Sequence, residues 1–341
     1  MTGSWPRRFF AEVAACTGIP PQPAAVPVLV GLDHRDKFGG ALLGTALGDA
    51  FGAPLEGASG SRLSSLVARR ADAPDRWRPT DDTQMMLDVA AWLLLPSEDP
   101  EALLAQLAEG YDAALGYGHG TKQVLHAYRS GRPWGACPFT TWPEGSKGNG
   151  SSARIAPVAC RFLNEPLRAE QVARMSSWVT HAHPDATAGA TLQMHAVRLA
   201  LGTAPEDFDG PAFLDQLATV TGELAGWPCG ALARIGALVG CGATAAEVRK
   251  QFEVARPLAE TTVPVALWAF VAGAPAFEER VGLAASVGGD VDTVCAMTGA
   301  LAGALLGTRG LPANWLVRLA PRYVERMEGL ADQLYSELDA T

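Results

Sequence analysis

The sequence predicts an all-α protein, and three features support this prediction. From residue 36 onward, segments rich in Ala and Leu carry apolar residues at helical spacing, and Gly or Pro separates these segments. Alternating runs of β-branched residues, which would indicate strands, are nearly absent. With 341 residues, of which 48% are hydrophobic, the chain is long enough to bury a large core. We therefore expect one compact helical domain over residues 36–341.

Residues 1–35 differ in composition from the rest of the chain. Ser4 to Cys16 has the spacing of a short amphipathic helix, and four prolines follow between Gly18 and Val28. A proline-rich segment of this kind forms a stiff spacer. We expect residues 1–35 to form an N-terminal extension with a linker, outside the main domain.

Charge and cysteine usage exclude several classes of protein. The chain has 27 basic and 36 acidic residues, a net charge of −9, which opposes binding to nucleic acid or to an anionic lipid surface. No stretch reaches the roughly 20 strongly apolar residues that a membrane span requires. The six cysteines show no paired spacing, which is typical of a reducing compartment. We expect a cytoplasmic protein without membrane or nucleic-acid partners.

Glycines recur at every fourth position in two segments. They are Gly40, Gly44, Gly48 and Gly52 in the first segment, and Gly299, Gly303 and Gly307 in the second. A glycine inside a helix costs up to about 1 kcal/mol relative to alanine, so this repetition needs a structural reason. A spacing of four places the glycines on one helix face, where the missing Cβ lets another backbone approach closely. The two segments therefore predict tight helix packing.

Two predicted helices begin with a pair of aspartates and a threonine. The first begins at Thr80-Asp81-Asp82-Thr83, and the second begins at Asp290-Val291-Asp292-Thr293. Thr80 suits an N-cap and the helix dipole favours acidic residues in a first turn, so each segment alone can be a well-capped helix start. Two such starts, each associated with a glycine-rich region, favour carboxylates that converge on one point.

Converging carboxylate and hydroxyl oxygens indicate a site for a hard cation. Oxygen ligands without His or Cys suit Mg²⁺, Mn²⁺ or Ca²⁺ rather than zinc. Four aspartates carry more charge than one divalent ion balances, so two ions are the expected number. Asp49 and Glu56, which lie near the end of the first glycine-rich segment, are further candidates for the same site.

Three polar segments are candidates for ligand binding. Residues 146–154 form a Gly/Ser-rich loop leading into a helix, an arrangement that binds phosphate through backbone N–H groups. The loop also matches a dinucleotide-binding fingerprint, but no strand precedes it, which argues against a Rossmann fold. Residues 116–121 are either a simple turn or a second flexible loop of the site. Of His181 and His183, the spacing favours one site residue beside one solvated neighbour over a metal site.

Taken in order, six segments of the chain resemble the ADP-ribosylglycohydrolase family. They are GDAFGAPLE, TDDTQM, GYGHGT, GNGSSARIAP, THAHPDA and GGDVDT. The resemblance extends from about Phe38 to Gly307. It implies an orthogonal all-α bundle with two bound Mg²⁺ or Mn²⁺ ions. It also implies a hydrolase that cleaves the bond at C1″ and releases ADP-ribose from a modified protein side chain or small molecule.

The resemblance also implies roles for individual residues. Those that match the family's metal ligands are Thr80, Asp81, Asp82, Asp290, Asp292 and Thr293. Those that match its substrate-binding segments are Gly118, Gly148, Asn149, Gly150, Ser151, Ser152 and His181. The expected catalytic residues are Glu56, Asp82 and Asp292, with Glu56 as the general acid or base and Asp82 as the alternative for that role.

A second function stays open on the same scaffold. A member of the family that has lost its activity would be an ADP-ribose-binding or structural protein, because a fold does not by itself carry a function. The presence of all six oxygen ligands favours the hydrolase.

Overall fold

The computed structural model describes residues 32–339, apart from residues 59, 73, 223, 225 and 255. The predicted amphipathic helix at 4–16 and the proline-rich linker lie outside the described residues. Within the described ranges the regular structure is helical, and a single isolated bridge joins Gly148 to Leu258. The prediction of an all-α fold is confirmed.

The helices follow one another with short connections. The α-helices are α2 (His34–Gly52), α3 (Gly60–Arg70), α4 (Asp81–Trp92), α5 (Pro100–Glu109), α6 (His119–Arg129), α7 (Gly150–Ala153), α8 (Ala156–Arg161), α9 (Pro166–Trp178), α10 (Pro184–Leu201), α11 (Gly210–Val220), α12 (Trp227–Gly240), α13 (Ala245–Gln251), α14 (Ala259–Ala272), α15 (Phe277–Val287), α16 (Val291–Leu306), α17 (Ala313–Leu316) and α18 (Pro321–Asp339). Short 3₁₀ turns are η1 (Ala53–Leu55), η2 (Ala113–Leu115), η3 (Trp134–Phe139), η4 (Pro205–Asp207) and η5 (Thr308–Gly310).

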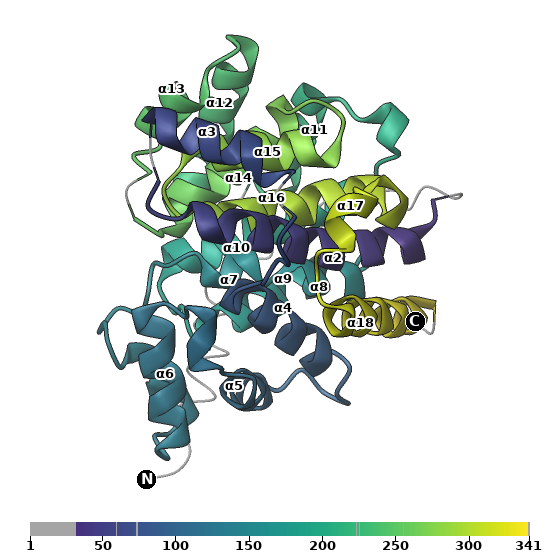
Figure 1. Cartoon of the computed structure of the whole chain (residues 1–341). Coiled ribbons are helices and arrows are strands. Elements are labelled where there is room, and N and C mark those ends of the chain that lie inside the picture. The colour runs from purple at the N-terminus through teal and green to yellow at the C-terminus, as the bar shows by residue number, and fades with distance from the viewer. Residues whose placement is uncertain are drawn as a thin grey trace.

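The centre of the fold is the pair formed by α2 and α16. Almost all residues of both helices are buried, and their apolar residues occupy every face, as expected for helices surrounded by protein. Figure 1 shows the two helices side by side across the middle of the molecule. They contain the two glycine-rich segments of the sequence, and Gly307 follows α16 as its C-cap.

The glycines of α2 lie directly against the backbone of α16, and the two helices run antiparallel. An added Cβ on any of the four glycines spaced by four would collide with main-chain atoms of the opposite helix. The contacting pairs are Gly40 with Gly303, Gly44 with Gly299, Gly48 with Cys295, and Gly52 with Asp292. The absence of side chains therefore allows the two backbones to touch over the whole length of the contact, as the spacing of four predicts.

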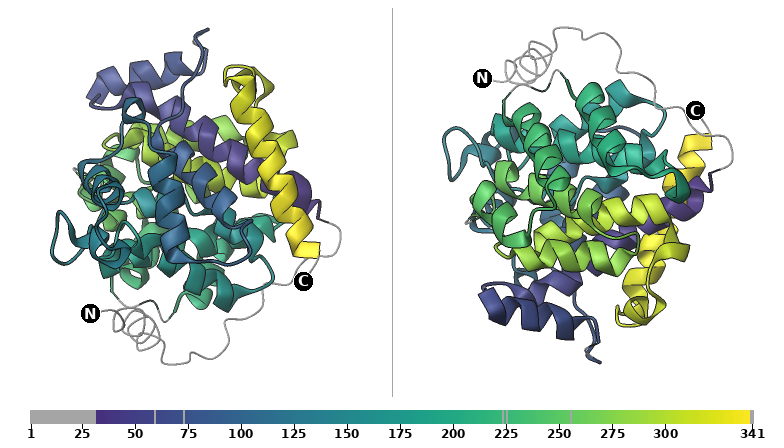
Figure 2. Two further views of the ribbon diagram at one scale, coloured as in Figure 1. Left: turned by 90° about the horizontal axis from the view of Figure 1, so that it is seen from below. Right: turned by 90° about the horizontal axis from the view of Figure 1, so that it is seen from above.

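The remaining helices enclose this pair. Helices α10, α14 and α15 pack around α16, and α18 packs on α2. Figure 2 shows α18, in yellow, along the outside of the bundle. The rings of Phe38 and Tyr335 meet edge to face at 6.0 Å between these two helices. At the solvent-exposed side of the same contact, the guanidinium of Arg35 pairs with Asp332 at 2.7 Å.

Two properties of the described part of the chain bear on its environment. None of its helices combines the length and the apolar character that crossing a bilayer requires. The cysteines within the same ranges are free thiols, and two of them, Cys229 and Cys241, are exposed. Cys16 lies outside the described residues.

We predict that Gly44→Ala destabilises the protein by about 1–3 kcal/mol, the usual cost of overpacking a core. The added methyl group would collide with the carbonyl oxygen of Gly299 and force α2 and α16 apart. The matched control is Gly236→Ala on α12, where an added Cβ would have no atom of another described segment within 4 Å. That change should be neutral or stabilising, because alanine is the better helix former.

Urea unfolding of the two variants and the unchanged protein provides the test. If Gly44→Ala unfolds at the same midpoint as the unchanged protein, the backbone contact does not constrain the fold as described.

Candidate active site

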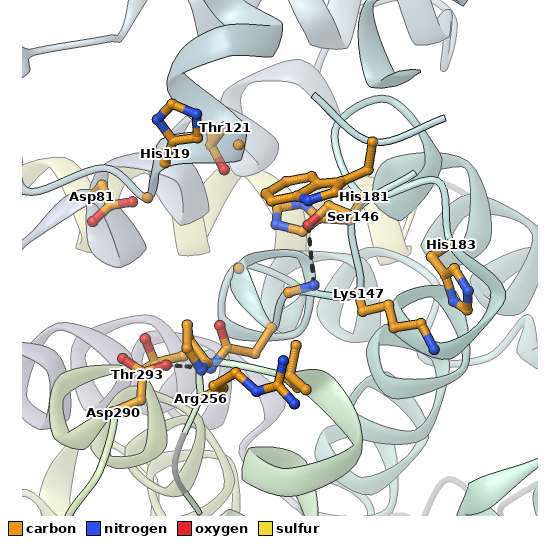
Figure 3. Close-up of a pocket in the computed structure, with 18 of the residues that line it drawn as sticks. Asp81, His119, Thr121, Ser146, Lys147, His181, His183, Arg256, Asp290 and Thr293 are labelled. Carbon is orange, nitrogen blue, oxygen red and sulfur yellow. Dashed lines mark hydrogen bonds between the residues drawn. The ribbon is translucent and has the colours of Figure 1, made fainter. Parts of the chain in front are cut away.

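A cavity of about 920 Å³ opens at one side of the bundle, where several helices begin. First turns or N-cap residues of α4, α6, α7, α10, α14 and α16 line it. In Figure 3, Asp81 and His119 lie on one side of the cavity, and Ser146 and His181 lie across from them. Helix N-termini carry partial positive charge, so their convergence favours negative groups in this cavity.

Asp49 of α2 fixes the start of α4. Its Oδ2 accepts hydrogen bonds from the backbone N–H of Thr80 at 2.8 Å and of Thr83 at 3.2 Å, and from the Thr83 hydroxyl at 2.5 Å. Thr80 is the N-cap of α4, as predicted, and its hydroxyl accepts from the N–H of Asp82. The first turn of α4 is therefore attached to α2, and Asp81 and Asp82 line the cavity.

Glu56 connects the end of the glycine-rich helix to the start of α16. Its Oε1 accepts from the backbone N–H of Val291 at 3.0 Å. Asp290 accepts from the side-chain amide of Asn149 at 2.5 Å, so the Gly/Ser-rich loop also reaches this helix start. Oxygen atoms of Glu56, Asp290 and Asp292 lie within 4.8 Å of one another, a spacing that could hold a metal ion.

Burial and mutual repulsion raise the pKa values of these carboxyl groups. Burial and the neighbouring Asp49 raise the pKa of Asp81 to about 7, and burial raises the pKa of Asp49 to about 6. Burial and Asp81 raise the pKa of Asp82 well above its ordinary value, and burial and Asp82 do the same for Asp292. A cation at this point would offset the repulsion that raises them.

The chemistry of these residues fits a divalent cation. Asp49 Oδ1 and Asp82 Oδ2 are buried and have no hydrogen-bond partner among the described residues. Buried charged oxygens are normally paired or coordinated, so the unpartnered Oδ2 of Asp82, a residue that lines the cavity, is a candidate cation ligand. Carboxylate and hydroxyl oxygens are the ligands that Mg²⁺, Mn²⁺ and Ca²⁺ prefer.

The Gly/Ser-rich loop and His181 form the opposite wall. An added Cβ at Gly148 would lie 3.2 Å from His181 Nε2, and one at Gly150 would lie 3.2 Å from His181 Cε1. The loop backbone therefore lies directly on the imidazole edge. The N–H groups of Gly148 and Asn149 are already donated, to Ser146 Oγ and to the carbonyl of Pro257.

The cavity brings together most of the residues that the sequence singles out. Its lining includes Glu56, Asp81, Asp82, Asp290, Asp292, Thr293, Gly118, Gly148, Asn149, Gly150 and His181. Four others do not line it. Asp49 binds the start of α4, Thr80 serves as the cap of α4, Ser151 accepts a hydrogen bond from Ser177, and Ser152 is buried with no partner for its hydroxyl among the described residues.

His183 differs from the solvated neighbour that the sequence suggests. It lines the cavity as well, and its side chain is 15% exposed. Its Nδ1 accepts from the N–H of Asp185 at 3.0 Å, which makes it the N-cap of α10. The Pro184 that follows suits the first position of that helix, so the local sequence contains a capping signal that the His spacing obscured.

Trp142 is a cavity residue that the sequence analysis missed. It is 43% exposed, which is unusual for so large an apolar side chain, and it lines the cavity. Its ring lies against Gly120, where an added Cβ would collide with it. The signal was the aromatic residue within the Pro-rich loop before the Gly/Ser segment, but only the folded loop places it there.

Comparison with known proteins identifies the class. A sequence model of the ADP-ribosylglycohydrolase family matches residues 31–341, so the chain belongs to this family of glycohydrolase enzymes. The fold comparison agrees. A solved structure described as an ADP-ribosylglycohydrolase-related protein complex superposes with a TM-score of 0.68 at 31% identity, covering 89% of this chain and 99% of that one.

Individual relatives are similar over nearly their whole length. The ADP-ribosylhydrolase ARH3 of Danio rerio is 29% identical over 92% of this chain and 93% of its own. The ADP-ribosylarginine hydrolase Tri1 of Pseudomonas putida (strain GB-1) is 29% identical over 89% of this chain and 81% of its own. The resemblance noted from six sequence segments is confirmed.

We predict that the protein, freed of divalent ions by a chelator, becomes less stable as the pH rises from about 5 to about 8. The folded cluster holds protons that the unfolded chain has already released, because the pKa of Asp81 is raised to about 7 and that of Asp49 to about 6. This contribution is fully present below pH ~4, the ordinary aspartate pKa, and is lost as the pH passes the raised values.

Calorimetric unfolding temperatures across this pH range provide the measurement. The double variant Asp81→Asn, Asp292→Asn should show a smaller decrease, because two of the repelling charges are gone. A constant unfolding temperature for the unchanged protein would contradict the electrostatic description of the cavity.

Proposed function

We propose that the cavity hydrolyses the bond at C1″ of ADP-ribose and so releases it from a modified protein side chain or small molecule. Membership of the ADP-ribosylglycohydrolase family supports the reaction class. The observation that carries the proposal is the convergence of two acidic helix starts on one cavity beside a glycine-rich loop. The partners are an ADP-ribosylated substrate and the ADP-ribose product.

We propose that two Mg²⁺ or Mn²⁺ ions act in this reaction. The proposed ligands are Thr80, Asp81, Asp82, Asp290, Asp292 and Thr293. The unpartnered Asp82 Oδ2 and the raised carboxyl pKa values support this assignment. When bound, such ions orient ribose hydroxyls and lower the pKa of a nearby water molecule.

The chain's own residues supply the rest of the chemistry. The glycines of residues 148–150 let the ADP-ribose phosphates approach the backbone closely, and His181 faces the same loop. Cleavage at C1″ passes through a transition state with oxocarbenium character, as in other glycosidic hydrolyses. The carboxylates of the cavity stabilise the positive charge that develops on the sugar ring.

Glu56 is the proposed general acid or base, and Asp82 is the alternative. Glu56 binds the N–H of Val291 through one oxygen, and burial together with Asp290 raises its pKa. A raised carboxyl pKa suits a group that must both hold and release a proton near neutral pH. Glu56 lies beside Asp290 and Asp292, so it could instead be a ligand of the metal ions. Metal titration of Glu56→Gln and Asp292→Asn, described below, distinguishes the two roles.

We predict that Glu56→Gln and Asp292→Asn have different effects. Asp292→Asn should weaken Mg²⁺ or Mn²⁺ binding by roughly 10–100-fold or more, because loss of a residue that only hydrogen-bonds to a metal ligand already has an effect of that size. The activity should fall together with the metal affinity. Glu56→Gln should keep the ions but lower kcat by roughly 100-fold or more, the usual contribution of general acid–base catalysis.

Metal titration calorimetry and release of ADP-ribose from Arg- and Ser-linked substrates provide the two measurements. An equal loss of metal affinity in both variants would place Glu56 among the ligands. ADP-ribose binding by the unchanged protein without turnover in the presence of either ion would favour the retired binding protein over the hydrolase.

We predict that Gly150→Val weakens ADP-ribose binding and leaves metal affinity unchanged. The valine side chain would crowd His181 and occupy space that the ligand needs. Gly236→Val is the matched control, since that glycine faces open space on α12, away from the cavity. Calorimetric titration with ADP-ribose tests this, and wild-type affinity in Gly150→Val would show that the loop does not contact the ligand.

A further inference from the structure

Three buried side chains behind the cavity form a linear chain of hydrogen bonds. Arg154 Nη2 donates to the carbonyl of Ser176 and, at 2.9 Å, to the hydroxyl oxygen of Thr180. That hydroxyl lies 2.7 Å from Nδ1 of His181. All three residues are at least 96% buried by accessible area, so water does not compete for these bonds.

The direction of each bond follows from the first one. A guanidinium can only donate, so Thr180 Oγ must accept from Arg154. The hydroxyl keeps one proton of its own, and His181 Nδ1 is the partner within reach of it among the described residues. If Nδ1 carried a proton instead, the hydroxyl would receive two donors and its own proton would be buried without an acceptor, which is unfavourable.

The order of donors therefore fixes the tautomer of His181. Nδ1 accepts, so the proton of the neutral imidazole is on Nε2. Burial and the nearby Arg154 lower the pKa of His181 to about 3, which agrees with a neutral ring.

The Nε2 edge is the part of the ring that meets the cavity. An added Cβ at Gly148 would lie 3.2 Å both from this nitrogen and from Ser146 Oγ, so the two groups flank the same glycine. Figure 3 shows His181 and Ser146 next to each other at the cavity wall. An N–H at this point faces the Gly/Ser-rich loop at the cavity wall.

We propose that Arg154 and Thr180 are positioning residues that hold His181 in the Nε2–H tautomer, so that it donates a hydrogen bond to an oxygen of bound ADP-ribose. The ligand part of this proposal rests on the proposed function, whereas the tautomer can be measured without any ligand. Arg154 and Thr180 do not line the cavity themselves and act through His181.

The first experiment is a nitrogen NMR spectrum of the ligand-free protein with isotope-labelled histidine, in which His181→Asn assigns the His181 signals. The unchanged protein should show an unprotonated Nδ1 and a protonated Nε2. Thr180→Ser keeps the hydroxyl and should give the same spectrum. Thr180→Val removes the donor and should give signals between the two tautomers. A protonated Nδ1 in the unchanged protein, or an unaltered spectrum in Thr180→Val, would overturn the proposal.

The second experiment is calorimetric titration of the same variants with ADP-ribose. Thr180→Val should raise the Kd in inverse proportion to the fraction of His181 that stays protonated at Nε2, about twofold for an even mixture of the two tautomers, whereas Thr180→Ser should leave the Kd unchanged. Mg²⁺ affinity should be equal in both. Unchanged ADP-ribose affinity in Thr180→Val would overturn the donor role. Failure of the unchanged protein to bind ADP-ribose would contradict the proposed function, while the predicted NMR spectrum would still support the tautomer assignment.

Discussion

The contact between the backbones of α2 and α16 is the constraint on which the rest of the structure depends. Glycines on one face of α2 allow main-chain atoms of the two helices to touch, so their relative position has little freedom. Gly52 meets Asp292 at one end of this contact, and Asp49 lies one turn earlier on α2. The contact thereby sets where two acidic groups lie, and Asp49 in turn anchors the start of α4. The packing of the α2 and α16 backbones at the centre of the bundle therefore determines where these acidic side chains lie.

In this arrangement, buried carboxyl groups repel one another at the cavity, next to a well-packed core. Several carboxyl groups lie together where burial and mutual repulsion raise their pKa values. Converging helix N-termini and the amide of Asn149 offset part of that repulsion. The remainder supports the proposed cation site, because a bound cation would relieve this repulsion. Perturbed carboxyl pKa values of this kind are common at functional sites.

Features encoded by local sequence were the ones that could be predicted. Helix periodicity, the cap at Thr80 and the glycine spacing each involve residues within a few positions of one another, and each is present in the structure. Orientation depends instead on contacts between distant segments. For this reason the sequence did not show that Ser151 turns toward Ser177 or that Trp142 reaches the cavity. The hydrogen bonds behind His181 likewise join residues whose sequence offers no motif for them. The cap that His183 makes on α10 is a local contact, and the Pro184 that follows it is a signal in the sequence that was overlooked.

The exposure of Trp142 makes the cavity observable by its own fluorescence. The tryptophans at positions 77, 92, 268 and 315 are at most 2% exposed, so their emission is that of indoles in an apolar interior. Trp134, Trp178 and Trp227 are half-buried and Trp5 lies outside the described residues, so the signal of Trp142 is obtained as the difference between the unchanged protein and Trp142→Phe. Trp142, at 43% exposure, contributes a red-shifted component that a water-soluble quencher can reach. A molecule that fills the cavity would cover this ring and shift its emission to shorter wavelength. Occupancy could then be followed in real time on the unlabelled protein, without a coupled assay or a modified ligand.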